Sequence, residues 1–211
     1  CSNRDSLNLA AQLGMGALTF AFVNADEAKF WVEEYYETFK NKCAPIGQAV
    51  NPNVAMLTGF MCDNDYETAM DRGQEGAQFF AFGLGHYWRD GTHIPGRTDL
   101  WSEFKKKPEF DIQQMERERK KAGMRGIGSP EQLIENFRAL EEAGVDQLIL
   151  LQQSGNYRHE HICKSMELFG REVLPQFKAR EAKRVKVKQD ELAPFIAEAQ
   201  RNIKQPEPLK E

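Results

Sequence analysis

Residues 128–177 read GSPEQLIENFRALEEAGVDQLILLQQSGNYRHEHICKSMELFGREVLPQF and predict a helix, a strand and a second helix. Ser129 is a suitable cap for the first helix, Pro130 fits its first position, and Gly144 is expected to end it. The apolar run at residues 147–151 has the length and composition of a strand buried on both faces. Such a unit is the repeat of a parallel α/β sheet or barrel.

The rest of the chain continues the same alternation. The predicted elements are a helix capped within Ser2–Ser6 and ending at Gly14, a strand at Gly16–Phe22, a helix from Asp26 through Phe39, a strand at Asn53–Cys62 and a long helix from Asn64 or Asp65. This order predicts a parallel sheet with right-handed crossovers. Ligands of such folds bind beyond the carboxyl ends of the strands, here around Gln152–Arg158.

Two segments interrupt the pattern. Residues 84–127 are rich in glycine, aromatic and charged residues; they are predicted to form a lid or site wall, with a dimer contact or surface excursion as the alternative. DIQQMERERKKAG (residues 111–123) fits a short polar helix. Residues 181–211 are predicted to be a charged, solvated tail with a short helix over Leu192–Ile203. The basic cluster at Lys178–Lys188 allows an acidic partner instead.

Composition narrows the class of protein. The 211 residues carry a net charge of −4 with a pI of about 5.7, which disfavours nucleic-acid binding. The sequence contains no apolar run of the ~20 residues that a membrane helix needs, and its start does not resemble a secretory signal. The four cysteines are widely spaced, as expected of reduced thiols, so a cytoplasmic location is predicted. Because a cap opens the chain where a strand should precede it, we expect the C-terminal part of a longer protein.

The first candidate for chemistry is the opening loop, with Ser2, Asn3, Arg4 and Ser6 at the start of a helix. Hydroxyl, amide and guanidinium groups at a helix N-terminus suit a phosphate, although an ordinary N-cap needs the same residue types. His159 is only two residues from His161, so the two diverge on a helix and a metal site is not expected. No nucleophile elbow, dinucleotide motif or phosphate loop is present.

Five segments together resemble the bacterial luciferase-like family of flavin-dependent monooxygenases. They are SNRDSLNLAAQLG, the short strand ending at Phe20, NPNVAMLTGFMCDNDYETAMDRG, GHYW…HIPGRTDLW, and the helix–strand–helix of residues 128–177. The resemblance implies the C-terminal portion of a (β/α)8 TIM barrel over residues 1–180, with residues 84–127 inserted before the last strand and a tail at 181–211. The first strands of the family, and the catalytic histidine of several members, have no counterpart here, so no catalytic acid or base is assigned.

The resemblance also implies a cofactor and partners. Reduced FMN from a flavin reductase would act with oxygen on an apolar substrate such as an aldehyde, terpene or hydrocarbon, in a homo-oligomer or dimer. A deazaflavin-dependent oxidoreductase and a non-catalytic binding or subunit module are the alternatives. The implied cofactor residues are Ser2, Asn3, Arg4, Ser6 and Phe20; the implied substrate pocket or lid residues are Phe80, His86, Trp88, Trp101 and Gln152.

Overall fold

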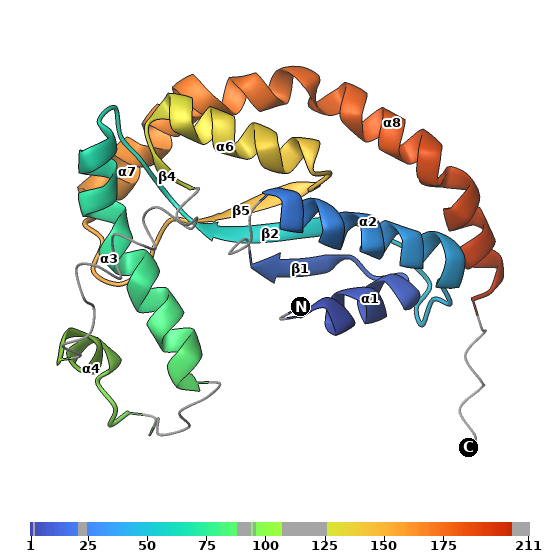
Figure 1. The fold of residues 1–211 in the computed structure, drawn as a ribbon, viewed down its shortest axis with the longest axis horizontal. Helices are drawn as coiled ribbons and strands as arrows, with labels where there is room; N and C mark the ends of the chain where they lie inside the picture. The colour runs from blue at the N-terminus through green and yellow to red at the C-terminus, as the bar shows by residue number, and fades with distance from the viewer. Residues whose placement is uncertain (2, 21–24, 88–93, 95, 107–125, 204–211) are drawn as a thin grey trace. The chain divides into compact units, whose positions relative to one another are not determined.

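The computed structural model describes residues 1, 3–20, 25–87, 94, 96–106 and 126–203, and for Phe20 the backbone only. Its elements, most of which are labelled in Figure 1, are α1 (Arg4–Gln12), β1 (Ala17–Phe20), α2 (Ala25–Lys42), β2 (Val54–Gly59), β3 (Met61–Cys62), α3 (Tyr66–Gly85), α4 (Leu100–Lys106), β4 (Ile127–Gly128), α6 (Pro130–Glu142), β5 (Gln147–Leu151), α7 (His159–Leu168), the π-helical turn η2 (Phe169–Val173) and α8 (Leu174–Arg201). The chain divides into two compact units. Unit 1 comprises residues 1–57, 139–149 and 177–211, and unit 2 comprises residues 58–138 and 150–176.

The strands confirm an α/β fold with parallel pairing. One sheet has the order β1-β2-β5, and β1 runs parallel to β2 with Ala17 opposite Val54 and Leu18 opposite Ala55. A second, two-stranded parallel sheet pairs β3 with β4. The expected strand at residues 53–62 is therefore two strands in different sheets, and β4 was not predicted. Two-residue strands such as β3 and β4 are too short to show a hydrophobic period.

The helix boundaries at α6 follow the local sequence. The Ser129 backbone N–H donates to the side-chain oxygen of Gln132, and the Gln132 backbone N–H donates to the Ser129 hydroxyl. This pair of bonds satisfies two of the backbone donors that a helix start leaves without partners. Gly144 takes φ +89°, and the next N–H, of Val145, bonds back to the Leu140 carbonyl. A left-handed residue at this position closes a helix, and glycine adopts it without strain.

Unit 1 is held by an apolar core between the strands and helices α1, α2, α6 and α8. Its buried members include Leu7, Val32, Tyr35, Phe39, Val54, Met56, Leu140 and Leu192. Trp31 is partly buried and packs against this cluster. A polar junction joins the elements as well, because the carboxylate of Asp146 accepts hydrogen bonds from the Tyr36 hydroxyl and the Val54 N–H.

The helix expected at Leu192–Ile203 begins earlier than predicted, and nearly all side chains of residues 181–191 are exposed, as expected of a solvated segment. One helix, α8, runs from Leu174 to Arg201, with Leu192 and Ala199 buried in unit 1. Every third or fourth residue there is apolar, which the charge of the intervening positions obscures. Basic residues of the cluster pair within the chain: Arg180 and Arg184 with Glu141, and Lys188 with Asp146.

The strand at residues 147–151 departs from the prediction of burial on both faces. In β5, Gln147 and Ile149 are exposed and the other three residues are half-buried. These side chains are exposed because β5 is an edge strand, at the end of the order β1-β2-β5 among the described strands. Continuous apolar sequence is typical of a central parallel strand but does not reveal whether both neighbours are present.

Unit 2 is organised around α3. Met70 and Ala69 of this helix pack with Met61 and Ile127 of the small sheet. Asp65 caps α3 by accepting from the Thr68 N–H, as the sequence predicted. Ser165 of α7 lies buried and accepts a hydrogen bond from the Cys62 N–H at 2.7 Å. In the described part of the chain, no helix has the length and apolar character needed to cross a membrane.

Candidate functional site

The start of α1 in unit 1 forms a complete capping box. The Asn3 side-chain oxygen accepts from the Ser6 N–H at 2.9 Å, and the Ser6 hydroxyl faces the Asn3 backbone. The helix end combines the positive end of the α1 dipole with polar side chains, the usual chemistry of a phosphate site. The alternative interpretation as an ordinary N-cap accounts for the same contacts. Ser2 is outside the described residues.

Arg4 turns toward α2 rather than across the helix end. Its Nε lies 2.8 Å from Oε2 of Glu34, and its guanidinium stacks 4.5 Å from the ring centroid of Phe30. The hydrogen bond to Arg4 lowers the pKa of Glu34. The structure thus pairs the charge of Arg4 with a carboxylate within unit 1. Phe20 ends β1, and its side chain is outside the described residues.

In unit 2, the loop that follows β5 is fixed against α3. The Ser154 hydroxyl donates to the Gly76 carbonyl at 2.5 Å, and the Tyr157 hydroxyl donates to the Gly73 carbonyl. A Cβ on Gly76 would lie 2.1 Å from Cε1 of Tyr157, so only glycine allows this approach. Burial raises the pKa of Tyr157, which keeps its hydroxyl protonated as a donor. Gln152 donates to the Phe60 carbonyl at 3.5 Å.

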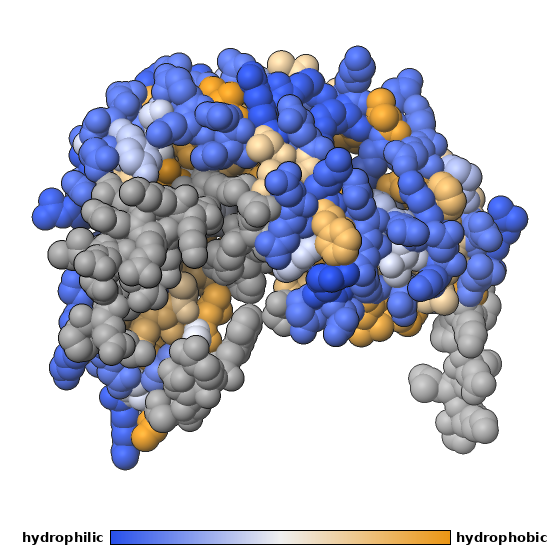
Figure 2. Space-filling view, viewed as in Figure 1, coloured by the Kyte–Doolittle hydropathy of each residue, from blue (hydrophilic) through white to orange (hydrophobic). Residues whose placement is uncertain are grey.

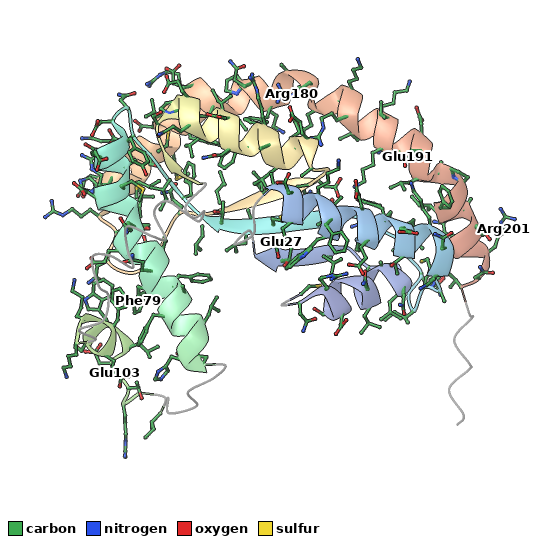
Figure 3. The ribbon with its side chains drawn as sticks, in the orientation of Figure 1. Glu27, Phe79, Glu103, Arg180, Glu191 and Arg201 are labelled. Atoms are coloured by element: carbon green, nitrogen blue, oxygen red, sulfur yellow. The ribbon has the colours of Figure 1, made fainter. Side chains whose placement is uncertain are left out.

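Beyond this contact, α3 and α4 share a cluster of rings, here called the aromatic cluster. Its members are Phe79, Phe82, His86, Trp101 and Phe104. The Phe79 ring meets Trp101 edge-on at 4.9 Å between centroids and Phe104 at 5.5 Å. A Cβ on Gly155 would lie 3.0 Å from Cζ3 of Trp101, so the loop touches the cluster. Figure 3 labels Phe79 on α3 and Glu103 on α4.

His86 lies at the far end of the aromatic cluster and is 4% exposed. Its Nδ1 is 3.9 Å from Oε2 of Glu103, and its ring is tilted against Phe82 at 6.0 Å. The side chain is thus packed among rings beside a carboxylate. The His86 ring is therefore part of the packed interior between α3 and α4 rather than of an open surface.

The structure brings together part of the predicted substrate set. Trp101 and His86 belong to the aromatic cluster, and the loop of Gln152 reaches it through Gly155. Phe80 is half-buried on α3, and Trp88 is outside the described residues, as is the helix expected at 111–123. The sequence did not single out Ser154, Tyr157 and the spacing of Gly73 and Gly76, although small residues three apart on one helix signal a close contact.

A hollow and a buried thiol in unit 2 are further candidates for chemistry among the described residues. A hollow of about 220 Å³ in unit 2 is lined by Cys62, Asp63, Asn64, Lys164, Glu167, Leu168 and Arg171, a set separate from the predicted site residues. Burial raises the pKa of the Cys62 thiol to about 12, which makes it a poor nucleophile. Within the described ranges, no three His, Cys, Asp or Glu side chains gather as a metal site would require.

Comparison with known proteins identifies the protein family to which the chain belongs. The chain belongs to the luciferase-like monooxygenase family, whose sequence model matches residues 1–147. No curated protein matches the sequence. Two of the similar solved structures are described here. One is the monooxygenase RslO1 from Streptomyces bottropensis, 16% identical with a TM-score of 0.54. The other is the coenzyme F420-dependent tetrahydromethanopterin reductase from Methanopyrus kandleri, 19% identical with a TM-score of 0.52.

The extent of these matches limits what they show. The alignments cover 83% and 84% of this chain but only 46% and 49% of the two structures, so the chain spans about half the length of either. At such identities the likeness shows the fold. The family match confirms the predicted family and, with it, the coarse class of oxidoreductase.

Proposed function

We propose that this chain is the C-terminal portion of an FMN-dependent monooxygenase that oxidises a small apolar organic molecule with oxygen. The observation that carries the proposal is the family match over residues 1–147, which includes the capped start of α1. The proposed architecture is a (β/α)8 barrel, of which β1, β2 and β5 are consecutive members. The parallel pairing of β1 with β2 is what the repeat of such a barrel requires.

The start of α1 is the proposed phosphate site of the cofactor. Capping occupies the side-chain oxygen of Asn3, and the Ser6 hydroxyl donates to the Asn3 carbonyl, from which it would turn to reach a phosphate oxygen. The other donors are the Asn3 Nδ2 atom and the first-turn N–H groups that precede Ser6. All of these suit phosphate oxygens, and the helix dipole adds to the attraction. Ser2 and Phe20 complete the proposal, Ser2 as a phosphate contact and Phe20 beside the flavin ring. Bound reduced FMN would supply the electrons for oxygen activation.

Arg4 contributes differently from a simple phosphate clamp. Since its Nε is bonded to Glu34, it holds the start of α1 to α2 and leaves only its other nitrogens for an anion. We therefore assign it a positioning role in the proposed site.

The aromatic cluster is the proposed wall of the substrate site in unit 2, together with Phe80, Trp88 and Gln152. Rings at 4.9–5.6 Å spacing along Phe79, Trp101, Phe104 and Phe82 present an apolar surface that favours hydrocarbon and excludes water. The hydrogen bond from Ser154 to α3 holds the adjoining loop in place. An apolar substrate such as an aldehyde or terpene fits this chemistry best.

The second candidate is a deazaflavin-dependent oxidoreductase, which transfers hydride without oxygen. The likeness to the F420-dependent reductase supports the same fold for that chemistry. A non-catalytic binding or subunit module is the third alternative. The proposal also includes a flavin reductase as electron source, a homo-oligomer as assembly and the cytoplasm as location.

The deciding experiment measures oxygen consumption by the native full-length protein with NADH and a flavin reductase. The proposal expects substrate-dependent oxygen uptake with FMN. Hydride transfer from a reduced deazaflavin without oxygen uptake would contradict the monooxygenase proposal and support the deazaflavin-dependent oxidoreductase. If the protein binds neither reduced cofactor, the result would support the third alternative, a non-catalytic module.

A further inference from the structure

Helix α7 in unit 2 carries a contact between two metal-binding side chains that the proposed flavin chemistry does not use. The Cys163 sulfur lies 3.4 Å from Nε2 of His159, one helical turn away. His159 is exposed and Cys163 is half-buried, so an ion from solution can reach both side chains. His161 lies about 200° around the helix from His159 and does not share this face.

The distance between these two atoms is close to the distance that a shared metal ion imposes. With metal–sulfur and metal–nitrogen bonds of about 2.3 and 2.0 Å, one ion at a tetrahedral angle holds its two donor atoms roughly 3.5 Å apart. The 3.4 Å contact as it stands is a hydrogen bond between thiol and imidazole. Both side chains can therefore turn to one ion without a change in the helix.

Met166 places a third donor on the same face of α7. It follows Cys163 by three residues and His159 by seven, which is the spacing of side chains along one side of a helix. Met166 is 56% exposed, so its thioether is accessible. The three rotatable bonds of methionine let its sulfur reach an ion held beside Cys163. This face of α7 thus presents an imidazole, a thiol and a thioether in a row.

These three donors favour a soft metal ion. Thiolate and thioether ligands select Cu(I), and imidazole also suits copper. A structural Zn²⁺ site, in contrast, is closed by four thiolate, imidazole or carboxylate ligands. Within the part of the chain that the structure describes, no third His, Cys, Asp or Glu side chain joins His159 and Cys163, so a closed zinc site does not form. Cu(I) needs fewer ligands than Zn²⁺, and the thioether of Met166 meets its preference.

We propose that the exposed face of α7 binds one Cu(I) ion through His159, Cys163 and Met166. The ion takes the place of the thiol proton, so binding releases that proton and the thiolate neutralises the single charge of the ion. Because the donors lie on an open helix surface, the bound ion exchanges readily with other ligands in solution. The site shares no residue with the start of α1 or with the aromatic cluster, so copper binding goes beyond the proposed function.

Competition with the chromogenic Cu(I) chelator bicinchoninate measures this binding in the native full-length protein, without oxygen and without a flavin. Cys163→Ser should bind one Cu(I) ion fewer than the native protein. His159→Ala and Met166→Leu should each weaken the affinity for that ion at least about tenfold, since even the partners of metal ligands commonly contribute that much. His161→Ala, on another face of α7, and Cys43→Ser, at a half-buried thiol in unit 1, are the matched controls and should leave the binding unchanged.

Equal affinities in His159→Ala and His161→Ala would overturn the proposal, as would a Cys163→Ser variant that binds as many Cu(I) ions as the native protein. Zn²⁺ that displaces Cu(I) from these residues would overturn it too, because the site would then not be selective for a soft ion. His159 and Met166 are exposed, so their variants keep the helix and test the site even if Cys163→Ser unfolds. Copper X-ray absorption of the loaded protein should show nitrogen beside sulfur ligands, and a spectrum with sulfur ligands alone would contradict the role of His159.

Discussion

Asp146→Ala removes a carboxylate that joins three elements of unit 1. Its Oδ2 atom accepts from the Tyr36 hydroxyl at 2.6 Å and from the Val54 N–H at 2.7 Å, and Oδ1 lies 2.7 Å from Nζ of Lys188. The Asp146 side chain is 12% exposed, and Val54 is fully buried. Alanine leaves both donors of the Oδ2 atom without an acceptor.

The expected loss of unfolding free energy in Asp146→Ala follows from these contacts. Hydrogen bonds to a charged group contribute roughly 1.5–3 kcal/mol each, and two buried donors lose theirs, so the loss of unfolding free energy is about 3–5 kcal/mol. Asp146→Asn keeps an oxygen at the Oδ2 position and sacrifices mainly the pair with Lys188, which is 30% exposed. We expect it to cost only about 1–2 kcal/mol.

Equilibrium urea unfolding, followed by circular dichroism, measures both variants, and exchange of the Val54 N–H reports on unit 1 directly. Asp190→Asn on the exposed side of α8 is the control and should be close to neutral. Equal losses for Asp146→Ala and Asp146→Asn would refute the reasoning, because they would show that the acceptor at Oδ2 is not what holds the junction.

Two further predictions concern packing and pH. Gly76→Ala should destabilise unit 2 by about 2–4 kcal/mol because its Cβ would meet Tyr157 and the Ser154 carbonyl. Gly83→Ala on the same helix has open space around its Cβ and should stabilise the protein by about 0.5–1 kcal/mol. Comparable urea midpoints for the two variants would contradict the close contact at Gly76. Burial raises the pKa of Tyr35 from 10.0 to about 12, and that of the Cys62 thiol from 9.0 to about 12. The folded protein then holds protons that the unfolded chain releases, so stability present below pH ~9 should fall as the pH rises toward 12. A urea midpoint that is constant from pH 8 to pH 11 would show that these groups are not buried as described.

Local sequence signals predicted much of the fold. Ser129, Gly144 and Asp65 mark helix ends through the hydrogen bonds that caps make, and such bonds depend on a few neighbouring residues. The exposure of Ile149 was not predictable, because an apolar run does not reveal which strands are beside it. The full length of α8 was missed because charged residues obscure its apolar period, and because the partner of a charge such as Arg180, Glu141, is 39 residues away. Figure 3 labels Arg180 on this helix, and Figure 2 shows how hydrophilic the outer surfaces of α6 and α8 are.

The two parts of the candidate site, the start of α1 and the aromatic cluster, differ in how far the sequence predicted them. The polar cap of Asn3 and Ser6 was evident from residue types alone, but those types do not distinguish a cap from a phosphate site, and the structure shows the cap. The proximity of Gly155 to Trp101 depends on a contact between a loop and a helix far apart in the sequence. Only the packing of α3 against both reveals that these segments belong together.

The most direct test of the proposed function compares the affinities of the native full-length protein for FMN and for riboflavin, which lacks the phosphate. If the start of α1 holds the phosphate, FMN binds at least about tenfold more tightly, as one charge-assisted contact already supplies. Ser2→Ala combined with Ser6→Ala then reduces that preference while riboflavin affinity stays constant. Equal affinities for FMN and riboflavin, or a preference that the double variant leaves unchanged, would contradict the assignment.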